Sequence, residues 1–338
     1  MSFRVRPAAG EDFPAIYEMA KLTGGGFTNL PPERATLVAK LARSEQSFAR
    51  QEDSQAGDLY MFVLEDPKTG RIRGTCQVFG QVGVVESFYS YHLSTLTQSS
   101  PELGKTFRNQ LLTLTNDLEG SSEVGGLFLH PQQRAGGWGS LLARSRYLFM
   151  KQHRPRFGER TLAELRGVMD DAGNAPFWDS LAGKFFGMSF PEADEFNAVH
   201  GTKFIADLMP RTPIYVSLLT EAANAVIGQP HPTGRAALRM LEEEGFVYDR
   251  YVDIFDGGPT VTVATDRIRT VRESTEETIG EIGEGGRTKA LLASGRLKDF
   301  RSCFGSVKRL AKKGICIDRE AADLLGVDIG DTVLAVAR

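Results

Sequence analysis

The sequence predicts a mixed α/β fold in which helices cover one twisted sheet. Two observations support this. Short runs suited to strands are interleaved with runs whose apolar residues recur at helical spacing. In addition, 41% of the residues are hydrophobic and 25% are charged, which is ordinary for a globular protein. With 338 residues, the chain is long enough for about two domains.

The first 80 residues predict a strand, two helices and a hairpin. Residues 2–8 alternate as in a strand, and residues 10–26 follow as a helix that stops at three glycines, Gly24 to Gly26. Residues 28–48 give a second helix. Two apolar runs joined by the turn residues "DPKTG" then predict a hairpin over 59–80.

The middle of the chain continues this alternation. An apolar strand over 123–131 leads through a glycine-rich loop into a helix over 140–150. Residues 161–170 predict another strand, and 174–188 predict a helix that ends near a glycine. Together with the preceding elements, this order describes a first unit over residues 1–190.

Beyond residue 190 the pattern partly recurs. Residues 213–228 are helical in pattern, and 233–255 combine a helix, a stop at Gly245 and an aromatic strand. Because 176–190 have the same helix-then-strand shape, we expect 191–270 to form a second, diverged copy of the half-fold.

Residues 271–338 are expected to form a small C-terminal β-rich extension. The polar, glycine-rich stretch 276–288 predicts a linker, and the basic stretch 296–313 predicts a solvated helical face. The last residues, 315–338, predict a strand, a short helix, a turn and a strand.

Charge and cysteine content exclude several classes of protein. A net charge of −3 provides no broad basic surface, so we expect no nucleic-acid partner. The odd, widely spaced cysteines match neither a disulfide framework nor a metal site; they are Cys76, Cys303 and Cys316. No apolar run approaches the roughly 18 residues of a membrane span, and the N-terminus lacks a signal core. We therefore expect a cytoplasmic protein with no membrane contact and no bound metal.

The loop between the strand at 123–131 and the following helix has the features of an anion site. It contains Arg134 and the glycines Gly136, Gly137 and Gly139. Glycines leave the unpaired N–H groups of a helix N-terminus open to a phosphate, and arginine adds charged donors. The alternative is a tight connection whose glycines only solve a packing problem.

The spacing of this loop indicates which diphosphate it would bind. A Walker A loop needs Lys-Ser/Thr after its last glycine, where this chain has Trp138, Gly139 and Ser140. A dinucleotide fingerprint fails as well, because the glycines fall as GGxG. The pattern Arg-x-x-Gly-x-Gly resembles the pyrophosphate loop of the acyl-CoA N-acyltransferase (GNAT) superfamily, and the element order resembles that fold.

Longer stretches are similar to one family, arginine N-succinyltransferase. They are "KLTGGGFTNLP", "FVLEDPKTG", "GSSEVGGLFLHPQQR", "AELRGVMDDAGNAPFWDSLAGKFF", "FIADLMPRTPIY", "VIGQPHP" and "GFVYDRYVDIFDGGPTV". The resemblance implies that succinyl-CoA, as a co-substrate and not as a tightly bound cofactor, donates its succinyl group to the α-amine of L-arginine. It implies L-ornithine as a further acceptor for some relatives. A homo-oligomer is a further expectation.

The resemblance also implies roles for two residues. Leu127 matches a succinyl-CoA contact on the central strand, where a backbone N–H would polarise the thioester carbonyl, and we include Leu129 on the same strand. His231, in "GQPHP", matches a histidine assigned as proton donor. Its unperturbed pKa of ~6.5 suits proton transfer near neutral pH. The alternatives are a core leucine and a surface turn histidine.

Chemistry suggests further substrate contacts. A guanidinium pairs well with a carboxylate, and the candidates are Glu123 and Asp253, with Glu164 and Asp256. The succinyl carboxylate needs a cation, for which we hypothesise Arg166; its alternative is a structural ion pair with Glu164. The turn "TGGGFTN" is expected to line the acceptor pocket.

Two rival functions remain at this point. One is a GNAT N-acetyltransferase that uses acetyl-CoA on another amine. The other is a non-catalytic sensor that binds CoA or arginine and regulates a partner, for which the C-terminal extension could provide contacts. Arginine-dependent release of thiol from succinyl-CoA would separate these classes of protein.

Overall fold

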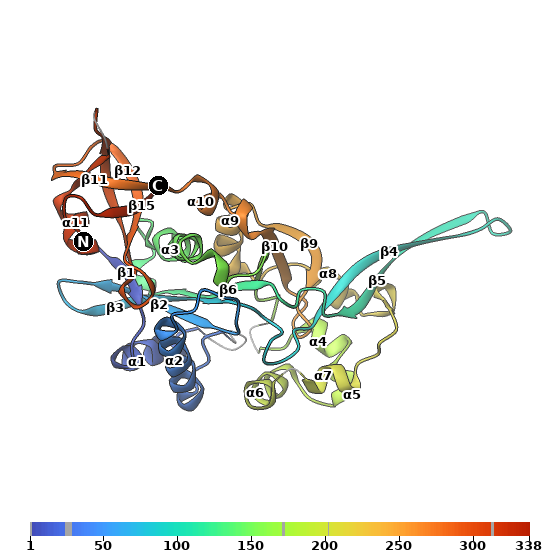
Figure 1. Ribbon diagram of the computed structural model, residues 1–338. Coiled ribbons are helices and arrows are strands. Elements are labelled where there is room, and N and C mark those ends of the chain that lie inside the picture. Colours follow the sequence, from blue (N-terminus) through green and yellow to red (C-terminus); the bar gives the residue numbers. More distant parts are fainter. Residues whose placement is uncertain (1, 24–28, 171–172, 202, 312–313) are drawn as a thin grey trace.

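A computed structural model describes residues 2–23, 29–170, 173–201, 203–311 and 314–338. Within these ranges, strands from all parts of the chain join in one extended sheet with helices on both faces (Figure 1). The strand order is β12-β15-β11-β14-β13-β1-β2-β3-β6-β7-β10-β9-β4-β5-β8. The mixed α/β class predicted from the sequence is confirmed.

The strands of the first 264 residues form one continuous part of the sheet, which we call the main sheet. They are β1 (Arg4–Pro7), β2 (Leu59–Asp66), β3 (Arg71–Phe79), β4 (Ser90–Ser100), β5 (Lys105–Thr115), β6 (Ser122–Leu129), β7 (Arg160–Glu164), β8 (Ile214–Tyr215), β9 (Val247–Val252) and β10 (Pro259–Ala264). Neighbouring strands pair antiparallel except β6 and β7, which are parallel. That parallel pair lies near the middle of the main sheet.

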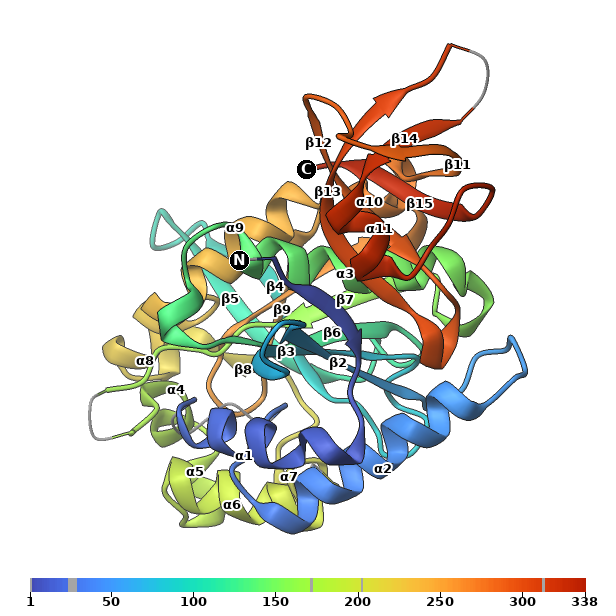
Figure 2. The same ribbon diagram turned by 90° about the vertical axis from the view of Figure 1, so that its left-hand side faces the viewer.

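Helices cover both faces of this sheet. The α-helices of the described residues are α1 (Phe13–Lys21), α2 (Arg34–Ala49), α3 (Trp138–Gln152), α4 (Pro176–Ser180), α5 (Gly183–Phe186), α6 (Phe190–His200), α7 (Lys203–Leu208), α8 (Glu221–Val226), α9 (Arg235–Glu243), α10 (Arg269–Glu273) and α11 (Arg319–Leu325). Figure 2 shows α1 and α2 on one side of the sheet and α3 and α9 on the other. The predicted helix over 174–188 is interrupted after α4, and α5 ends at Gly187 as expected.

The side chains of β2 show why two helical layers are needed. Tyr60, Phe62 and Leu64 pack on the α3 side, whereas Met61 and Val63 pack with α1 and α2. Because successive strand residues point to opposite faces, an apolar run such as this one is buried only when both faces are covered.

The predicted division into a first unit and a diverged second copy stays a prediction, and the strand order shows which sheet the later strands join. β10 pairs with β7, and β9 pairs with β10, so both strands continue the sheet that begins at β1. Residues 191–270 thus contain most of α6, then α7 and α8, followed by α9 and two further strands of the same sheet. The helix and strand predicted over 233–255 are present as α9 and β9.

The C-terminal part of the chain closes into a small barrel. Its strands are β11 (Thr275–Gly283), β12 (Thr288–Ser294), β13 (Arg301–Arg309), β14 (Ile315–Asp318) and β15 (Thr332–Ala337). Pairing of β12 with β13 closes the ring, and β13 also pairs with β1. The predicted linker over 276–288 was wrong because it contains β11. The predicted helical face over 296–313 was wrong because it contains β13, whereas the end of the chain has the predicted elements.

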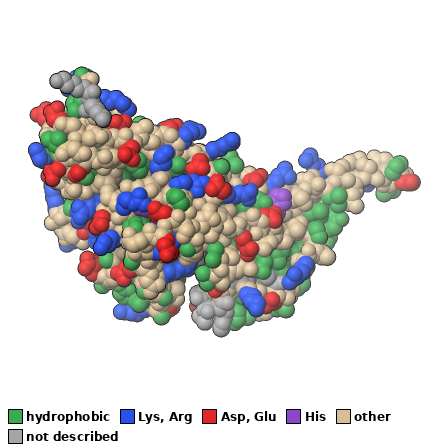
Figure 3. Space-filling model, viewed as in Figure 1, with side chains coloured by type: hydrophobic (Ala, Val, Ile, Leu, Met, Phe, Trp, Pro, Cys, Tyr) green, Lys and Arg blue, Asp and Glu red, His purple; other side chains and the backbone are tan. Residues whose placement is uncertain are grey.

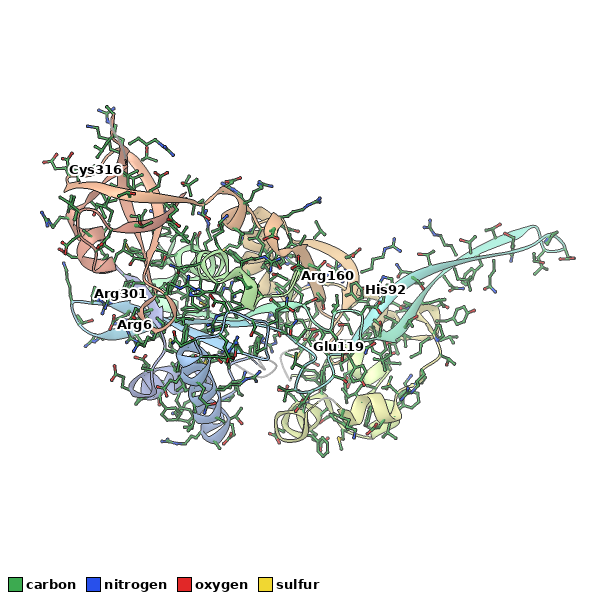
Figure 4. All side chains as sticks on the ribbon, in the orientation of Figure 1. Arg6, His92, Glu119, Arg160, Arg301 and Cys316 are labelled. Atoms are coloured by element: carbon green, nitrogen blue, oxygen red, sulfur yellow. The ribbon has the colours of Figure 1, made fainter. Side chains whose placement is uncertain are left out.

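A long hairpin, which the sequence did not predict, projects from the sheet (Figure 1). We call β4 and β5 the arm. Figure 3 shows hydrophobic side chains along one edge of it, and Phe107 is 58% exposed. At its base, Tyr91 and Leu112 pack with Trp178 and other residues of α4 to α8, and His92 lies beside Tyr251 (Figure 4). These helices therefore provide a core for the root of the arm.

The described helices include none with both the length and the apolar character that a bilayer crossing needs.

His153 links the main sheet to the barrel and provides a test of the fold. This fully buried ring donates from Nδ1 to Phe149 O at 3.0 Å and accepts from the Leu297 backbone N–H at Nε2, at 3.3 Å. A second ring proton would remove that acceptor. Burial, the largest cause, and two nearby arginines lower the pKa of His153 to about 4.

We expect His153 to make folding sensitive to acid. Since its pKa is lower in the folded state, its contribution is present above its unfolded pKa of ~6.5 and is lost as the pH falls towards 4, by about 3 kcal/mol in total. Denaturant unfolding of wild type and His153→Phe at several pH values measures this. The difference in unfolding free energy should narrow as the pH falls. Parallel curves would contradict the prediction.

Candidate active site

The centre of the sheet opens between β6 and β7. The two strands pair only at Ser122 with Thr161 and at Glu123 with Leu162. From Val124 to Leu129, β6 continues with only β3 as its partner. The N–H and C=O groups that β6 turns toward β7 are therefore available to a ligand lying between the two strands.

A bulge in β6 lies at this opening. Its register with β3 shifts between Thr75 and Gln77, and Gly126 on β6 has φ of +57°. A side chain at Gly126 would also collide with Gln77, since a Cβ there would lie 2.7 Å from Nε2. Arg146 of α3 donates to Gly125 O at 3.2 Å. The bulge is thus held from both sides, and it turns the backbone at Leu127.

The glycine loop has the geometry of an anion site. Gly136 and Gly137 have φ of +82° and +81°, and α3 begins directly after them. Leu141 is the first residue of α3 whose N–H is bonded, to Gly137 O at 3.1 Å. The preceding N–H groups, of Trp138, Gly139 and Ser140, form no backbone hydrogen bond within the described chain. These are the donors that a diphosphate requires.

The other predicted loop residues surround these donors. Arg134 is exposed and its guanidinium forms no hydrogen bond or ion pair within the described residues. Trp138 is half-buried, with its ring 4.9 Å from that of Phe3. Leu127 and Leu129 are half-buried and pack against the core under α3, so any ligand contact that they make would come from the backbone.

The four predicted carboxylates lie in one region, on the face of the sheet opposite α3. Ala163 and Leu165 pack on the α3 side, so Glu164 between them points the other way, as does Glu123 on β6. Burial is the largest cause that raises the pKa of Glu164 well above its usual value, followed by the charges of Asp253, Glu123 and Asp256. We call these carboxylates the acidic pocket.

The aspartates of the acidic pocket differ from its glutamates in the number of backbone hydrogen bonds that they accept. Asp256 accepts from the N–H of Gly167 at 2.7 Å and of Gly258 at 2.8 Å. Asp253 accepts from the N–H of Phe255 at 2.7 Å and of Asp256 at 2.8 Å. These two aspartates hold the turn after β9, which was not predictable from the sequence. Burial raises the pKa of both.

The two glutamates accept fewer hydrogen bonds than the aspartates. Glu123 accepts from Asn29 Nδ2 at 3.0 Å, and Glu164 has one long contact, with Thr260 Oγ1 at 3.5 Å. Glu164 is therefore the carboxylate with the most unused acceptor capacity in the acidic pocket. The sequence did not distinguish it from the other three candidates. Across the described part of the chain, no three His, Cys, Asp or Glu side chains are arranged to hold a metal ion.

Arg166 lies two residues beyond Glu164, at the same edge of the opening. It forms no ion pair within the described residues, so the predicted pair with Glu164 is absent. Its Nε is buried without a partner, and Nη2 is 3.9 Å from Met169 Sδ. An arginine with unused donors at the mouth of a pocket is suited to binding a carboxylate.

His231 is brought to Arg166 through the backbone. The His231 N–H donates to Arg166 O at 2.8 Å, beside a bridge between Gly167 and Pro230. Nδ1 accepts from the Thr233 N–H at 3.3 Å and lies 2.7 Å from Thr233 Oγ1. Since a backbone N–H can only donate, Nδ1 is the acceptor and Nε2 carries the proton of the neutral ring. Burial first, and then Arg166, lower the pKa of His231.

The cysteines take no part in this site. All three are buried and free, and Cys316 lies in the barrel (Figure 4). Burial raises the pKa of Cys76 to about 12, so that it is a thiol and not a nucleophilic thiolate at neutral pH.

The structure does not describe every residue that was predicted for the site, and it adds residues that the sequence did not indicate. Most of the turn "TGGGFTN", residues 24–28, lies outside the described residues. Asn29, the last residue of that predicted turn, donates to Glu123, whereas Lys40, Gln77 and Thr233 contact the site and were not predicted. No motif marks them, because they come from separate helices, strands and turns.

Comparison with known proteins identifies the family of the chain. A family model described as the arginine N-succinyltransferase beta subunit matches residues 3–270, and one for its C-terminal domain matches 267–337. Proteins named arginine N-succinyltransferase from Salmonella schwarzengrund and Salmonella agona are 42% identical over 302 residues, which cover 89% of this chain and 88% of theirs.

A solved structure is similar over nearly the whole chain. Subunit AI of an arginine/ornithine succinyltransferase from Pseudomonas aeruginosa superimposes with a TM-score of 0.90 at 32% identity, covering 99% of this chain and 98% of that one. With one family model spanning most of the sequence and close relatives along its length, the chain belongs to the arginine N-succinyltransferase family.

Proposed function

We propose that this chain transfers the succinyl group of succinyl-CoA to the α-amine of L-arginine, giving CoA and N2-succinyl-L-arginine. The observation that carries the proposal is the acidic pocket at the opening of the sheet, beside β6, whose far end leads into a glycine loop with N–H groups that form no backbone hydrogen bond in the described chain. Arginine brings two cations, its guanidinium and its α-ammonium, and this pocket supplies carboxylates for both.

The glycine loop is proposed to bind the diphosphate of succinyl-CoA. Trp138, Gly139 and Ser140 provide backbone donors, Gly136 and Gly137 allow close approach, and Arg134 adds charge. The pantetheine arm would then follow the unpaired edge of β6. This direction brings the thioester to Leu127, where the bulge leaves an N–H for the carbonyl oxygen.

On the acceptor side, Glu164 is proposed to bind the guanidinium, with Glu123 beside it. Both point to the face that α1 and α2 cover, and Glu164 has unused acceptors. Arg166 is proposed to bind the succinyl carboxylate, because its Nε is buried without a hydrogen-bond partner among the described residues, although the charges of Asp256 and Asp194 act on it. Glu164 then holds the guanidinium of arginine, and Arg166 holds the carboxylate of the succinyl group. Fixing both substrates in this way places the α-amine near the thioester.

The transfer itself requires two bond changes. The α-ammonium first loses a proton to water, and the neutral α-amine then attacks the thioester carbon, so that the C–S bond breaks as the carbonyl re-forms. His231, with its proton on Nε2, is proposed to give that proton to the departing sulfur, and the nitrogen that becomes an amide loses a proton that restores the ring. A direct transfer agrees with the buried state of the cysteines.

The acceptor range is a finer part of the proposal. The Pseudomonas aeruginosa structure is described as an arginine/ornithine succinyltransferase subunit. L-Ornithine has the same two positive charges but lacks the planar fork that pairs with a carboxylate in two contacts. We therefore propose arginine as the preferred acceptor and ornithine as a second one.

The test is a thiol-release assay with succinyl-CoA and a panel of amino acids. We expect release that depends on L-arginine, with less on L-ornithine and none on L-glutamate. Equal rates with acetyl-CoA, or no dependence on any amino acid, would contradict the proposal.

Arg134→Ala is expected to weaken binding of succinyl-CoA and to leave turnover at saturation nearly unchanged. The side chain contacts the diphosphate in the proposal and not the reacting carbon, so its loss affects ground state and transition state alike. Initial rates over a range of succinyl-CoA concentrations measure this, with a KM increase of roughly 10-fold expected for a loss of about 1.4 kcal/mol. A fall in the saturated rate alone would count against it.

A further inference from the structure

Lys40 of α2 lies on the wall of the acidic pocket. Its Nζ donates to Asn29 O at 2.9 Å, and Gln77 Nε2 donates to the same oxygen at 2.8 Å. Asn29 in turn donates from Nδ2 to Glu123 Oε1 at 3.0 Å. Lys40 is therefore connected to Glu123 through one residue.

This lysine has unused binding capacity. It uses one of its three donors and forms no ion pair within the described residues, although the charge of Glu123 acts on it. Its Nζ lies 5.8 Å from the centre of the Phe79 ring. Burial lowers its pKa to about 8. A lysine held in such surroundings without a carboxylate is costly unless a ligand supplies one.

The wall also lies beside the proposed position of the thioester. Gln77 packs against Gly126, the bulge residue that precedes Leu127, and its Oε1 is buried without a hydrogen-bond partner among the residues that the structure describes. An amino acid whose amine approaches Leu127 would carry its α-carboxylate two bonds away from that amine. The wall formed by Lys40 and Gln77 is on the same face as Glu123 and Glu164.

We propose that Lys40 binds the α-carboxylate of the acceptor and so selects α-amino acids over amines that lack this group. This inference rests on the proposed function, because it takes the acidic pocket as the acceptor site. It also separates the two carboxylates of the reaction, with the succinyl end at Arg166 and the amino-acid end at Lys40. Each anion then has a cation of its own.

Calorimetric titration of the full chain with L-arginine and with L-argininamide tests the proposal. The amide keeps the α-amine and the guanidinium but has no carboxylate charge. Wild type should bind arginine more tightly than the amide by about 30-fold or more, as expected for a desolvated charge pair. In Lys40→Met the two affinities should become equal, through loss of arginine affinity alone, and Lys40→Arg should restore part of the difference.

Lys21→Met serves as the matched control, since Lys21 is an exposed lysine on the neighbouring helix α1 that pairs with Glu18. It should leave both affinities unchanged. If Lys40→Met lowers the affinities for arginine and the amide in parallel, Lys40 only supports Asn29 and the proposal is overturned. An unchanged preference for arginine overturns it too. Lys40→Gln, a second neutral variant, provides the same comparison if Lys40→Met does not fold.

These binding measurements need no succinyl-CoA. A wild-type chain that prefers arginine over the amide through Lys40, yet releases no thiol, would contradict the proposed transfer and leave this inference standing. A chain that releases thiol with arginine, but whose preference for arginine over the amide does not change on loss of Lys40, would support the proposed transfer and contradict this inference.

Discussion

His231→Ala should lower the saturated rate of succinyl transfer by about 10²- to 10⁴-fold, the usual contribution of a positioned proton donor. Binding of arginine and of succinyl-CoA should change little, because Nε2 acts on the departing sulfur and Nδ1 is occupied by Thr233. Stopped-flow thiol release measures the rate, and calorimetry measures both affinities.

His130→Ala is the matched control for this variant. His130 also precedes a proline, and its Nδ1 accepts from the N–H of Gln132 at 3.3 Å, as Nδ1 of His231 does from Thr233. The two substitutions therefore remove the same local hydrogen bond. We expect His130→Ala to keep its saturated rate within a few-fold of wild type. Equal rates for His231→Ala and wild type would refute the role of His231.

Glu164→Gln should raise the KM for L-arginine by roughly 30- to 150-fold, which corresponds to about 2 to 3 kcal/mol for loss of one partner of a desolvated charge pair. The KM for succinyl-CoA should stay near its original value. Glu159→Gln is a suitable control, since Glu159 directly precedes β7 and is exposed. If both variants behave alike, Glu164 does not bind the guanidinium.

The same residue should make arginine binding depend on pH. Burial and the charges of Asp253, Glu123 and Asp256 raise the pKa of Glu164, so its protonated form persists to higher pH than that of an ordinary glutamate. A guanidinium requires the ionised form, so affinity should fall as the pH decreases through that raised pKa, and binding should release protons. Titrations in buffers of different ionisation enthalpy measure this release, which should shrink in Glu164→Gln.

The sequence was sufficient for the elements with strong periodicity and for the glycine loop. The loop could be recognised because its residues are contiguous and each glycine is needed where it stands: Gly136 and Gly137 take left-handed backbone angles, and Gly126 does the same at the bulge. The acidic pocket could be anticipated only as a set of candidates. Their ranking depends on hydrogen bonds that turn residues make, such as those of Gly167 and Gly258 to Asp256.

Other parts could not be predicted, for physical reasons. The arm has strands rich in Ser, Thr and Gln with little burial beyond its base, so its outer part carries no apolar period. In the barrel, β11 buries few of its side chains, and β13 buries small ones such as Ser302 and Gly305. Lys40 was missed because a lysine on an amphipathic helix usually faces solvent, and only the position of Asn29 shows that this one does not.

The pairing of β1 with β13 has a consequence for how the molecule is made. Arg4 and Val5 lie opposite Cys303 and Ser302. One of the first strands to leave the ribosome therefore pairs with a strand that is synthesised near the end of translation. At translation speeds of about 5–20 residues per second, nearly the whole synthesis time, roughly 15–60 s, passes before that edge is covered. During this interval the edge of β1 that does not face β2 is unpaired, and a chaperone that shields such edges would protect the nascent chain from aggregation.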